Sequence, residues 1–403
     1  MDRAGSYSPL GASVRAFIPK RLPPDPAIRY SDEYVAALAE AGENLGRLDA
    51  TAATLPGADL FVKMYVRKEA VLSSQIEGTQ STLVDLLRFE AGSPPSTSEA
   101  DVGEVANYVK ALNLGLDRLE HGSQLDLELI LDVHRELLTG VRGGDRRPGS
   151  FRNEQVWVGF DRCRIEEADF VPPPLGEVAR LMGDLELYAN TESKLPRLTR
   201  AALLHFQFET IHPFFDGNGR VGRMLITLFL TRAGSLRRPL LYLSHYFRQR
   251  REEYCARLQA VRDDGDWESW LIFFLRGVAE VSEQASATAC RIAELREANR
   301  AEILKLMGGR AGRALSLLES LYGKPIVSVE EVRRITHASF PTANTLVSAL
   351  ESLGILQEAT GHRHNRRYAY VPYIQILSEP EASPLDANTP TTVAEPAVSE
   401  RGD

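Results

Sequence analysis

The residues best suited to chemistry lie together in one short segment, which runs from Ile211 to Arg223 and reads IHPFFDGNGRVGR. The helical spacing before it must stop at Pro213, because proline cannot extend a helix. Glycines on both sides of Asn218 allow a tight turn and a close approach of a ligand to the backbone. Helical spacing resumes at about Gly219, and the free amides and dipole at the start of that helix form an anion site.

Four side chains of this segment suit the transfer of a phosphoryl or nucleotidyl group. Arg220 and Arg223 lie three positions apart on one helical face and can reach adjacent phosphates. Asp216 is a hard carboxylate that suits Mg²⁺, and His212 is a suitable proton acceptor near neutral pH. Each residue alone is more often part of a solvated helix connector, whereas the whole set indicates phosphoryl or nucleotidyl transfer.

The segment His212–Arg223 matches the pattern HPFxDGNGRxxR without a substitution, and on these residues the chain resembles the Fic family. Most Fic proteins are adenylyltransferases that move AMP from ATP to a hydroxyl side chain of a protein. The resemblance implies that His212 is the base, that Asp216 holds Mg²⁺ and that ATP is the co-substrate. It further implies that the other residues of the motif bind the nucleotide: Gly217, Asn218, Gly219, Arg220, Val221, Gly222 and Arg223. Relatives that act as kinases carry Lys in place of Gly219, so the resemblance favours AMP transfer.

A second segment, between Arg152 and Phe170, alternates apolar residues before the turn-like GFDR and predicts a short β-hairpin. From the residues alone, a structural hairpin over the core is as good an interpretation as a binding element. The resemblance identifies it as the family's flap, which clamps a target peptide by strand addition. Flap residues would then lie beside the nucleotide: Val158, Gly159, Phe160 and Asp161.

The helix that carries Tyr254 and Arg262 resembles the part of Fic proteins that closes the adenine side of the site. The resemblance implies that Arg262 contacts the nucleotide. Cys255 stands where the family commonly has a second Tyr, so this chain departs from the pattern there.

An N-terminal helix ends in the run Ser73-Ser74-Gln75-Ile76-Glu77-Gly78, which matches the inhibitory motif (S/T)xxxE(G/N) of Fic proteins. A carboxylate at Glu77 beside Arg223 would form a charge-assisted pair and occupy the donor that the γ-phosphate needs. Transfer depends on the position of the α-phosphate, so this pair would act as a brake. The alternative is a solvated surface glutamate. The resemblance favours the brake, with Ser73 as part of the motif.

The expected fold is all-α: a Fic-type helical bundle with a short β-hairpin flap, followed by a C-terminal winged helix-turn-helix domain. Its six expected parts are an extended arm (1–30), a helical segment with the inhibitory helix (31–110), a core (111–278), a helical connector (279–310), the winged-helix domain (311–373) and a disordered tail (374–403). The winged helix is inferred from three helical patterns followed by two short strands. DNA and another protein chain both remain possible partners of this domain.

Composition is that of an ordinary globular protein: 403 residues, 43% hydrophobic, with 47 basic against 55 acidic residues and a net charge of −8. Three cysteines without a CxxC pair argue against a disulfide framework or a thiolate zinc site. The first residues contain no apolar segment typical of a secretory signal, and no apolar run could span a bilayer. A cytoplasmic location without membrane attachment is therefore expected.

These observations favour a Mg²⁺-ATP-dependent protein adenylyltransferase that modifies a Ser, Thr or Tyr hydroxyl and is autoinhibited by Glu77. The target would dock on the flap, and its identity is not encoded in the motifs. Two alternatives stay open. One is a DNA-binding regulator whose Fic core senses a nucleotide, and the other is an enzyme that removes AMP with water positioned by Glu77. Homodimerisation is equally open.

Overall fold

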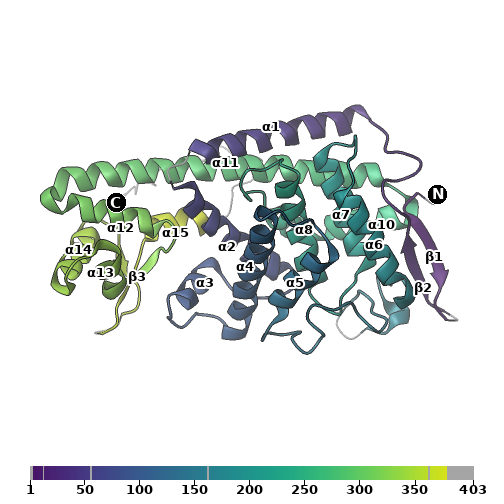
Figure 1. Ribbon diagram of the computed structural model, residues 1–403, viewed down its shortest axis with the longest axis horizontal. Helices are drawn as coiled ribbons and strands as arrows, with labels where there is room; N and C mark the ends of the chain where they lie inside the picture. The colour runs from purple at the N-terminus through teal and green to yellow at the C-terminus, as the bar shows by residue number, and fades with distance from the viewer. Residues whose placement is uncertain (1–2, 12, 55–56, 161–162, 362–363, 379–403) are drawn as a thin grey trace, which may run out of the picture.

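The computed structural model describes residues 3–11, 13–54, 57–160, 163–361 and 364–378. Helices dominate it, and the strands are few and short, which confirms the predicted mainly helical class. Two long helices, α1 (Asp32–Thr54) and α11 (Trp267–Leu306), lie side by side along one edge, with the shorter helices beneath them (Figure 1). Within the described residues, no helix is both long and apolar enough to cross a membrane.

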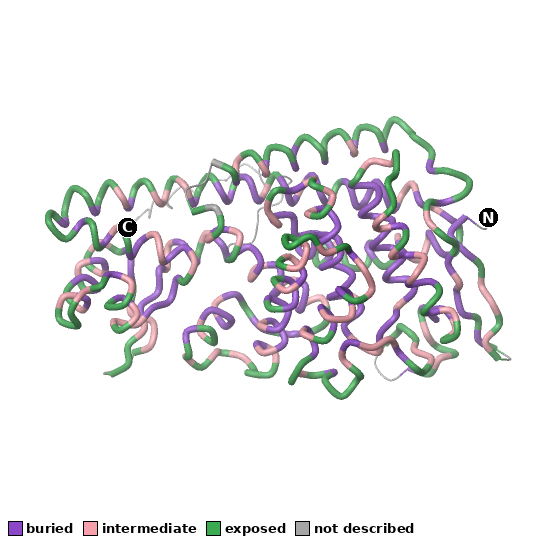
Figure 2. The backbone as a smooth tube through the Cα atoms, viewed as in Figure 1, coloured by how far each residue is buried: buried purple, intermediate pink, exposed green. Residues whose placement is uncertain are grey.

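The pairing of α1 with α11 follows from matching stripes of small and apolar residues. Buried residues of α1 recur at intervals of three and four: Tyr34, Ala37, Ala41, Leu45, Leu48 and Ala52. The same spacing continues along α11: Val278, Val281, Ala285, Ala289 and Ile292. Such a stripe keeps one face of a helix against its neighbour over several turns. The opposite face of α1 remains exposed (Figure 2).

Within the part of the chain that the structure describes, the body is built from nine further α-helices. Their bounds are α2 (Ala58–Ile76), α3 (Leu83–Glu90), α4 (Glu99–Glu120), α5 (Leu127–Leu138), α6 (Val178–Asn190), α7 (Arg197–Ile211), α8 (Asn218–Arg232), α9 (Ser244–Gln249) and α10 (Arg251–Asp264). In α7, all residues from Leu198 to Ile211 are buried. A helix that is buried all round lies at the centre of its core, so α7 and its neighbour α8 hold the loop between them, His212–Gly217, in a rigid setting.

The predicted extended arm over residues 1–30 is wrong for its central part, which forms a β-hairpin. Strands β1 (Gly5–Pro9) and β2 (Arg15–Pro19) pair antiparallel, with Gly5 opposite Pro19. An isolated hairpin is marginal in water, and this one is held by tertiary contacts. The guanidinium of Arg3 pairs with Glu268 at 2.8 Å, and the amide of Phe17 donates to the carbonyl oxygen of Val171 at 3.0 Å.

Two predicted domain boundaries fall inside continuous helices. Residue 110 lies within α4, and the predicted connector 279–310 consists mostly of the second half of α11, a single helix of 40 residues. The buried stripe of α11 passes through residue 279 without a break, so there is no physical boundary at that point. The short 3₁₀ helix η3 (Gly308–Arg310) follows α11 and marks the actual change of direction.

The C-terminal part contains the three predicted helices and the two strands after them. Its elements are α12 (Ala311–Leu321), β3 (Ile326–Ser328), α13 (Val329–Thr336), α14 (Phe340–Ser352), β4 (Gln357–Glu358) and β5 (Arg367–Ala369). Strand β3 was not predicted, and it pairs with β5 in an antiparallel sheet of order β3-β5-β4. The assignment of this part as a winged helix-turn-helix stays a prediction.

The predicted tail begins too early, because α15 (Val371–Ser378) continues the chain as a helix. Tyr373, Ile374 and Leu377 are buried, and α15 packs against α11, so apolar burial holds this short helix in place. Residues 379–403 lie outside the described residues. A cavity of about 370 Å³ is lined by Leu377 together with residues of α2 and α3. The C-terminal part therefore lies directly against the helix that ends at Glu77.

The predicted flap hairpin is present only as one β-bridge. Val158 and Phe170 exchange both backbone hydrogen bonds, at 2.8 and 3.1 Å. Between them the chain makes the 3₁₀ helix η1 (Ile165–Glu167), and a second 3₁₀ helix, η2 (Leu175–Glu177), leads into α6. Prolines at 172–174 cannot donate ladder hydrogen bonds, so the pairing stops after one bridge.

Candidate active site

The loop between α7 and α8 carries the predicted chemistry and has an unusual backbone. His212 ends α7 with a left-handed conformation, φ 49° and ψ 61°, and its amide donates to the carbonyl oxygen of Phe208 at 3.0 Å. Gly217 caps α8 with φ 79°. The first intrahelical bond runs from the Val221 amide to the Gly217 carbonyl. The amides of residues 218–220 therefore precede the helical ladder and are free to bind an anion.

Asn218 holds the loop closed instead of facing the ligand side. Its side-chain oxygen accepts from the Phe214 amide, and its side-chain nitrogen donates to the Phe214 carbonyl, both at 2.9 Å. The side chain is buried. Only the backbone of Asn218 remains available for the predicted nucleotide contact.

Replacing Asn218 with Ala should lower the free energy of unfolding by about 2 kcal/mol, because two buried backbone groups of Phe214 lose their partners. Urea denaturation measures this loss. The control is Asn113→Ala on the exposed face of α4, which should change stability by less than about 0.5 kcal/mol. Equal losses of unfolding free energy in the two variants would contradict the role of Asn218 in holding the loop closed.

One cavity of about 410 Å³ opens onto this loop. It brings together six of the residues predicted from sequence: Glu77, Val158, His212, Gly219, Arg223 and Arg262. Residues from the end of α2, from the flap, from α7, from α8 and from α10 contribute to its wall. The predicted base, the predicted brake and the predicted flap therefore share one space.

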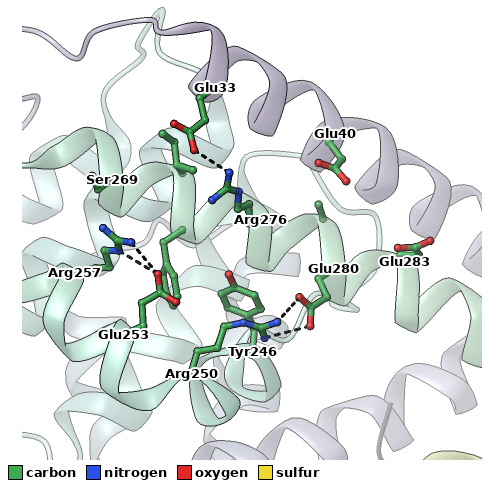
Figure 3. A pocket seen from close by; sticks show the side chains of 13 residues that line it. Glu33, Glu40, Tyr246, Arg250, Glu253, Arg257, Ser269, Arg276, Glu280 and Glu283 are labelled. Carbon is green, nitrogen blue, oxygen red and sulfur yellow. Dashed lines mark hydrogen bonds and ion pairs between the residues drawn. The ribbon is translucent and has the colours of Figure 1, made fainter. Parts of the chain in front are cut away.

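A larger cavity, about 540 Å³, lies beside α1, α10 and α11 and contains no residue of the 212–223 motif. Its wall is lined with ion pairs, among them Arg276–Glu33 at 2.8 Å and Arg250–Glu280 at 2.9 Å (Figure 3). The arginines of this wall face glutamates, and the first turn of α8 does not contribute to the cavity. Despite its size, this cavity is not the candidate active site.

Glu77 and Arg223 form the predicted ion pair, with 2.6 Å between the carboxylate Oε1 and Nη2. Arg223 also donates to Ser73, from Nε to the hydroxyl at 2.8 Å and from Nη2 to the carbonyl at 3.0 Å. Burial alone would raise the pKa of the Glu77 carboxyl, but the charges of Arg223 and Arg220 hold that pKa below its usual value. The carboxylate is therefore ionised, and it takes up the donors of Arg223.

Gly219 is what allows Glu77 to come so close to α8. A Cβ at this position would collide with Oε1 of Glu77 and would lie 2.9 Å from Nη1 of Arg223. The carboxylate thus sits against the first turn of α8, where the helix dipole favours negative charge. Glu77 occupies the part of the anion site that a phosphate group would need.

Arg220 has other partners than Arg223 in this structure, and its contact with a phosphate stays a prediction. It is 1% exposed and pairs with Glu104 of α4 at 3.0 Å and with Asp216 at 3.3 Å. Glu104 binds Arg142 as well, at 3.0 Å. The pair with Glu104 was not predicted, because Glu104 lies far away in the sequence, in a helix that carries no motif.

Asp216 has the chemistry expected of a magnesium ligand. Its carboxylate is 38% exposed and accepts from the Gly217 amide at 2.5 Å. Among the described residues, no three His, Cys, Asp or Glu side chains gather to hold a metal. Mg²⁺ bound here would take its remaining ligands from water and from phosphate oxygens, which is its usual habit. The residues present fit that ion.

The other two motif residues predicted to bind nucleotide contribute to packing. Val221 is fully buried in the hydrophobic core, and its amide is spent on the first turn of α8. Gly222 lies so close to Glu209 that a Cβ would collide with its carboxylate. Both residues position α8 and have no side chain in the cavity.

The flap contributes Val158 to the cavity wall, whereas Phe160 points outward and is 63% exposed. Gly159 packs beside the sulfur of Cys163. Asp161 lies outside the described residues. Exposed Trp157 and Phe160 give the flap an apolar outer surface next to the cavity mouth.

Arg262 lines the same cavity, with its guanidinium 3.7 Å from the centre of the Phe170 ring. Its Nε donates to Thr210 at 3.3 Å, and burial lowers its pKa to about 10. Tyr254, from the same helix, lines the cavity too, and its hydroxyl is hydrogen bonded to Nε2 of His205 at 2.8 Å. A flat cation and an aromatic ring thus form part of the wall of this cavity.

His212 is suited to act as a base. Burial lowers its pKa to about 4, with Arg152 and Arg262 adding to the effect and the Glu209 backbone and Glu77 opposing it. At neutral pH the ring is uncharged. A ring N–H bonded to the Glu209 carbonyl leaves the other nitrogen free to accept a proton.

Two buried residues that support this loop were missed in the sequence. His134 on α5 stacks on Phe214 with ring centroids 3.6 Å apart, and its Nε2 lies 3.1 Å from the Asp216 carbonyl oxygen. Arg152 donates to the His212 carbonyl at 3.0 Å. Both act across long sequence separations, and neither stands in a local pattern that would single it out.

Two family models match the chain. The model described as Fic/DOC family N-terminal matches residues 35–117, and the model described as Fic/DOC family matches residues 124–230. The second match includes the loop and α8, and the first includes Glu77.

Curated relatives carry the name protein adenylyltransferase Fic. The Drosophila virilis protein is 40% identical over 113 residues, which are 28% of this chain and 21% of the relative. The Drosophila grimshawi protein is 34% identical over 163 residues, 40% of this chain and 29% of the relative. The chain thus spans less than a third of the length of these relatives.

Solved structures show the same fold at low identity. A Fic family protein from Desulfovibrio desulfuricans G20 superposes with a TM-score of 0.56 at 21% identity, over 85% of this chain and 97% of that one. Fic-1 (residues 134–508) from C. elegans gives a TM-score of 0.50 at 23% identity, over 65% and 73%. Residues 35–117 and 124–230 of this chain therefore form a Fic/DOC family N-terminal domain and a Fic/DOC family domain, in a fold shared with solved Fic family proteins.

Proposed function

We propose that this protein is a Mg²⁺-ATP-dependent adenylyltransferase that moves AMP to a Ser, Thr or Tyr hydroxyl of a protein, and that Glu77 restrains it. The observation that carries the proposal is the single cavity into which His212, the first turn of α8 and Arg223 converge. The Fic/DOC family match over residues 124–230 and the names of the curated relatives support the same reaction.

The reaction uses the groups around the loop in order. The neutral imidazole of His212 accepts the proton of the target hydroxyl, whose oxygen attacks the α-phosphorus of ATP. The bond to the bridging oxygen breaks, and pyrophosphate leaves with its charge against the amides of α8 and the guanidinium of Arg223. Asp216 would hold Mg²⁺, which would neutralise phosphate charge. The flap would keep the target backbone beside His212 through strand addition.

Glu77 would weaken the binding of the γ-phosphate and would leave the position of His212 unchanged. Its carboxylate binds Arg223 and lies against α8, so the γ-phosphate loses a donor and meets a negative charge. ATP that is shifted in the cavity would present its α-phosphorus away from the attacking oxygen, and small displacements are costly for transfer.

The experiment that tests the reaction compares two labels on ATP. The full chain with Glu77→Gly is incubated with Mg²⁺ and a cell lysate, using ATP labelled at the α- or at the γ-phosphate. We expect covalent label on protein from the α position alone. Label from the γ position alone would identify phosphate transfer, and no label from either would contradict the proposal.

Removal of AMP is a second candidate, because the ionised carboxylate of Glu77 lines the same cavity as His212. In that case Glu77 would orient water towards the AMP–protein bond. Target protein that has been loaded with AMP by the Glu77→Gly variant would lose its label when the unaltered protein is added. DNA binding by residues 311–373 stays a prediction from sequence.

A further inference from the structure

Arg152 is a buried arginine that the proposed reaction does not use. It is only 2% exposed, and it lies where the chain leaves the region after α5 and enters the flap. A guanidinium withdrawn from water costs free energy unless its donors are satisfied. Burial lowers its pKa to about 10, so the group is still charged at neutral pH.

The guanidinium of Arg152 binds carbonyl oxygens of three separate segments. Nε donates to His212 at 3.0 Å, Nη1 to Glu154 at 3.2 Å and Nη2 to Pro173 at 2.6 Å. The backbone amide of Arg152 donates to the carbonyl of Pro213 at 2.9 Å. Glu154 precedes the Val158–Phe170 bridge of the flap, and Pro173 follows it. One planar group therefore joins the chain on both sides of this bridge to the loop His212–Gly217.

The carbonyl that accepts from Nε of Arg152 belongs to His212, the residue whose backbone is left-handed. A non-glycine residue with positive φ is held there by its surroundings. His212 has φ 49°, and two of its neighbouring peptide oxygens, its own and that of Pro213, are fixed from Arg152. The orientation of the imidazole therefore depends on the position of Arg152.

We propose that Arg152 is a positioning residue for AMP transfer, because it fixes the distance between the imidazole of His212 and the flap on which the target docks. This inference rests on the proposed function. An arginine spreads its donors over three nitrogens of a rigid plane, so they can reach acceptors on separate segments, whereas the three donors of a lysine all lie on one nitrogen. Geometry, and not merely positive charge, is what the site requires.

The test is made in the active Glu77→Gly background with Arg152→Lys and Arg152→Ala. We expect kcat to fall about 100-fold in both, the loss associated with a misplacement of about 1 Å. The KM for ATP should stay within about twofold, because Arg223, Arg262 and the first turn of α8 are untouched. Added guanidinium ion should restore part of the kcat of Arg152→Ala, which a loss of stability alone would not allow.

Arg200 provides the matched control. It too is buried and donates to backbone carbonyls, those of Tyr188 at 2.8 Å and Thr191 at 2.7 Å, but these lie at the end of α6. Arg200→Ala should lower stability and leave the kcat of the folded protein within about twofold of its parent, with no response to guanidinium.

The outcomes separate this inference from the proposed function. A parent Glu77→Gly protein that transfers no AMP overturns the proposed function, and the role of Arg152 with it. An active parent whose Arg152→Lys variant keeps its kcat overturns the inference alone. Equal losses in the Arg152→Ala and Arg200→Ala variants, without rescue, would likewise reduce Arg152 to a structural residue. Faster hydrogen exchange of residues 153–160 and 163–174 in Arg152→Lys than in Arg200→Ala would support the link to the flap.

Discussion

Glu77→Gly should raise AMP transfer about 10- to 100-fold, because a charge-assisted hydrogen bond to Arg223 worth about 1.5–3 kcal/mol becomes available to the γ-phosphate. The carboxylate that lies against Gly219 is removed at the same time, so the first turn of α8 can accept phosphate oxygens. The measurement is the initial rate of label transfer from α-labelled ATP, to the protein itself and to targets in a lysate.

Glu90→Gly is the matched control for this increase. Glu90 also ends a helix of the N-terminal part and pairs with an arginine, Arg67, at 2.8 Å, but it does not line the cavity. Its removal should leave the transfer rate within about twofold, because neither Glu90 nor Arg67 lines the cavity. If Glu77→Gly were no faster than the unaltered protein with several targets and divalent metals, the brake would be refuted.

His212→Ala should abolish transfer in the Glu77→Gly background, with a loss of at least about 10²- to 10⁴-fold, the usual contribution of a general base. ATP binding should persist, since Arg223, Arg262 and the start of α8 remain. Comparing the kcat of AMP transfer with the Kd for ATP separates a lost base from a lost site. The exposed His121, at the end of α4, is the control, and its replacement by Ala should change neither.

The pH dependence follows from the same residue. Burial lowers the pKa of His212 to about 4, so the ring is neutral and competent above that value and is lost as a base when the pH falls through it. Between about pH 6 and pH 8 the rate should therefore show no acid limb from this histidine. An acid limb with an apparent pKa near 6.5 in the kcat profile of the Glu77→Gly protein would contradict the low pKa of the buried ring.

The chemistry of the loop was predictable because its residues are contiguous. His212, Asp216 and Gly219 stand within one short motif, and proline and glycine fix the turn between two helices wherever these helices pack. The ion pair between Glu77 and Arg223 spans a long sequence separation, yet it was predictable because both ends stand in recognisable motifs. Local pattern was sufficient in both cases.

The supporting residues could not be predicted, because their partners are set by tertiary packing. Glu104 looks like any helical glutamate until α4 is placed beside α8, where it takes Arg220 away from the cavity. Arg152 and His134 bind backbone oxygens, which every residue possesses and which leave no trace in composition. The N-terminal hairpin is similar, since its order depends on Glu268 and Val171 at distant positions.

Because α11 is one continuous helix, it fixes the distance between the helices packed at its start and the helices packed at its end. Forty residues rising about 1.5 Å each make a rod of about 60 Å, whose first turns rest on α7 and α10 and whose last turns carry α12 and α15. Such a rod cannot fold at its middle without breaking its own hydrogen bonds. A partner protein bound by residues 311–378 would therefore be held at a fixed distance from the imidazole of His212. Only those hydroxyls of the partner that lie at that distance from its binding surface could reach the imidazole.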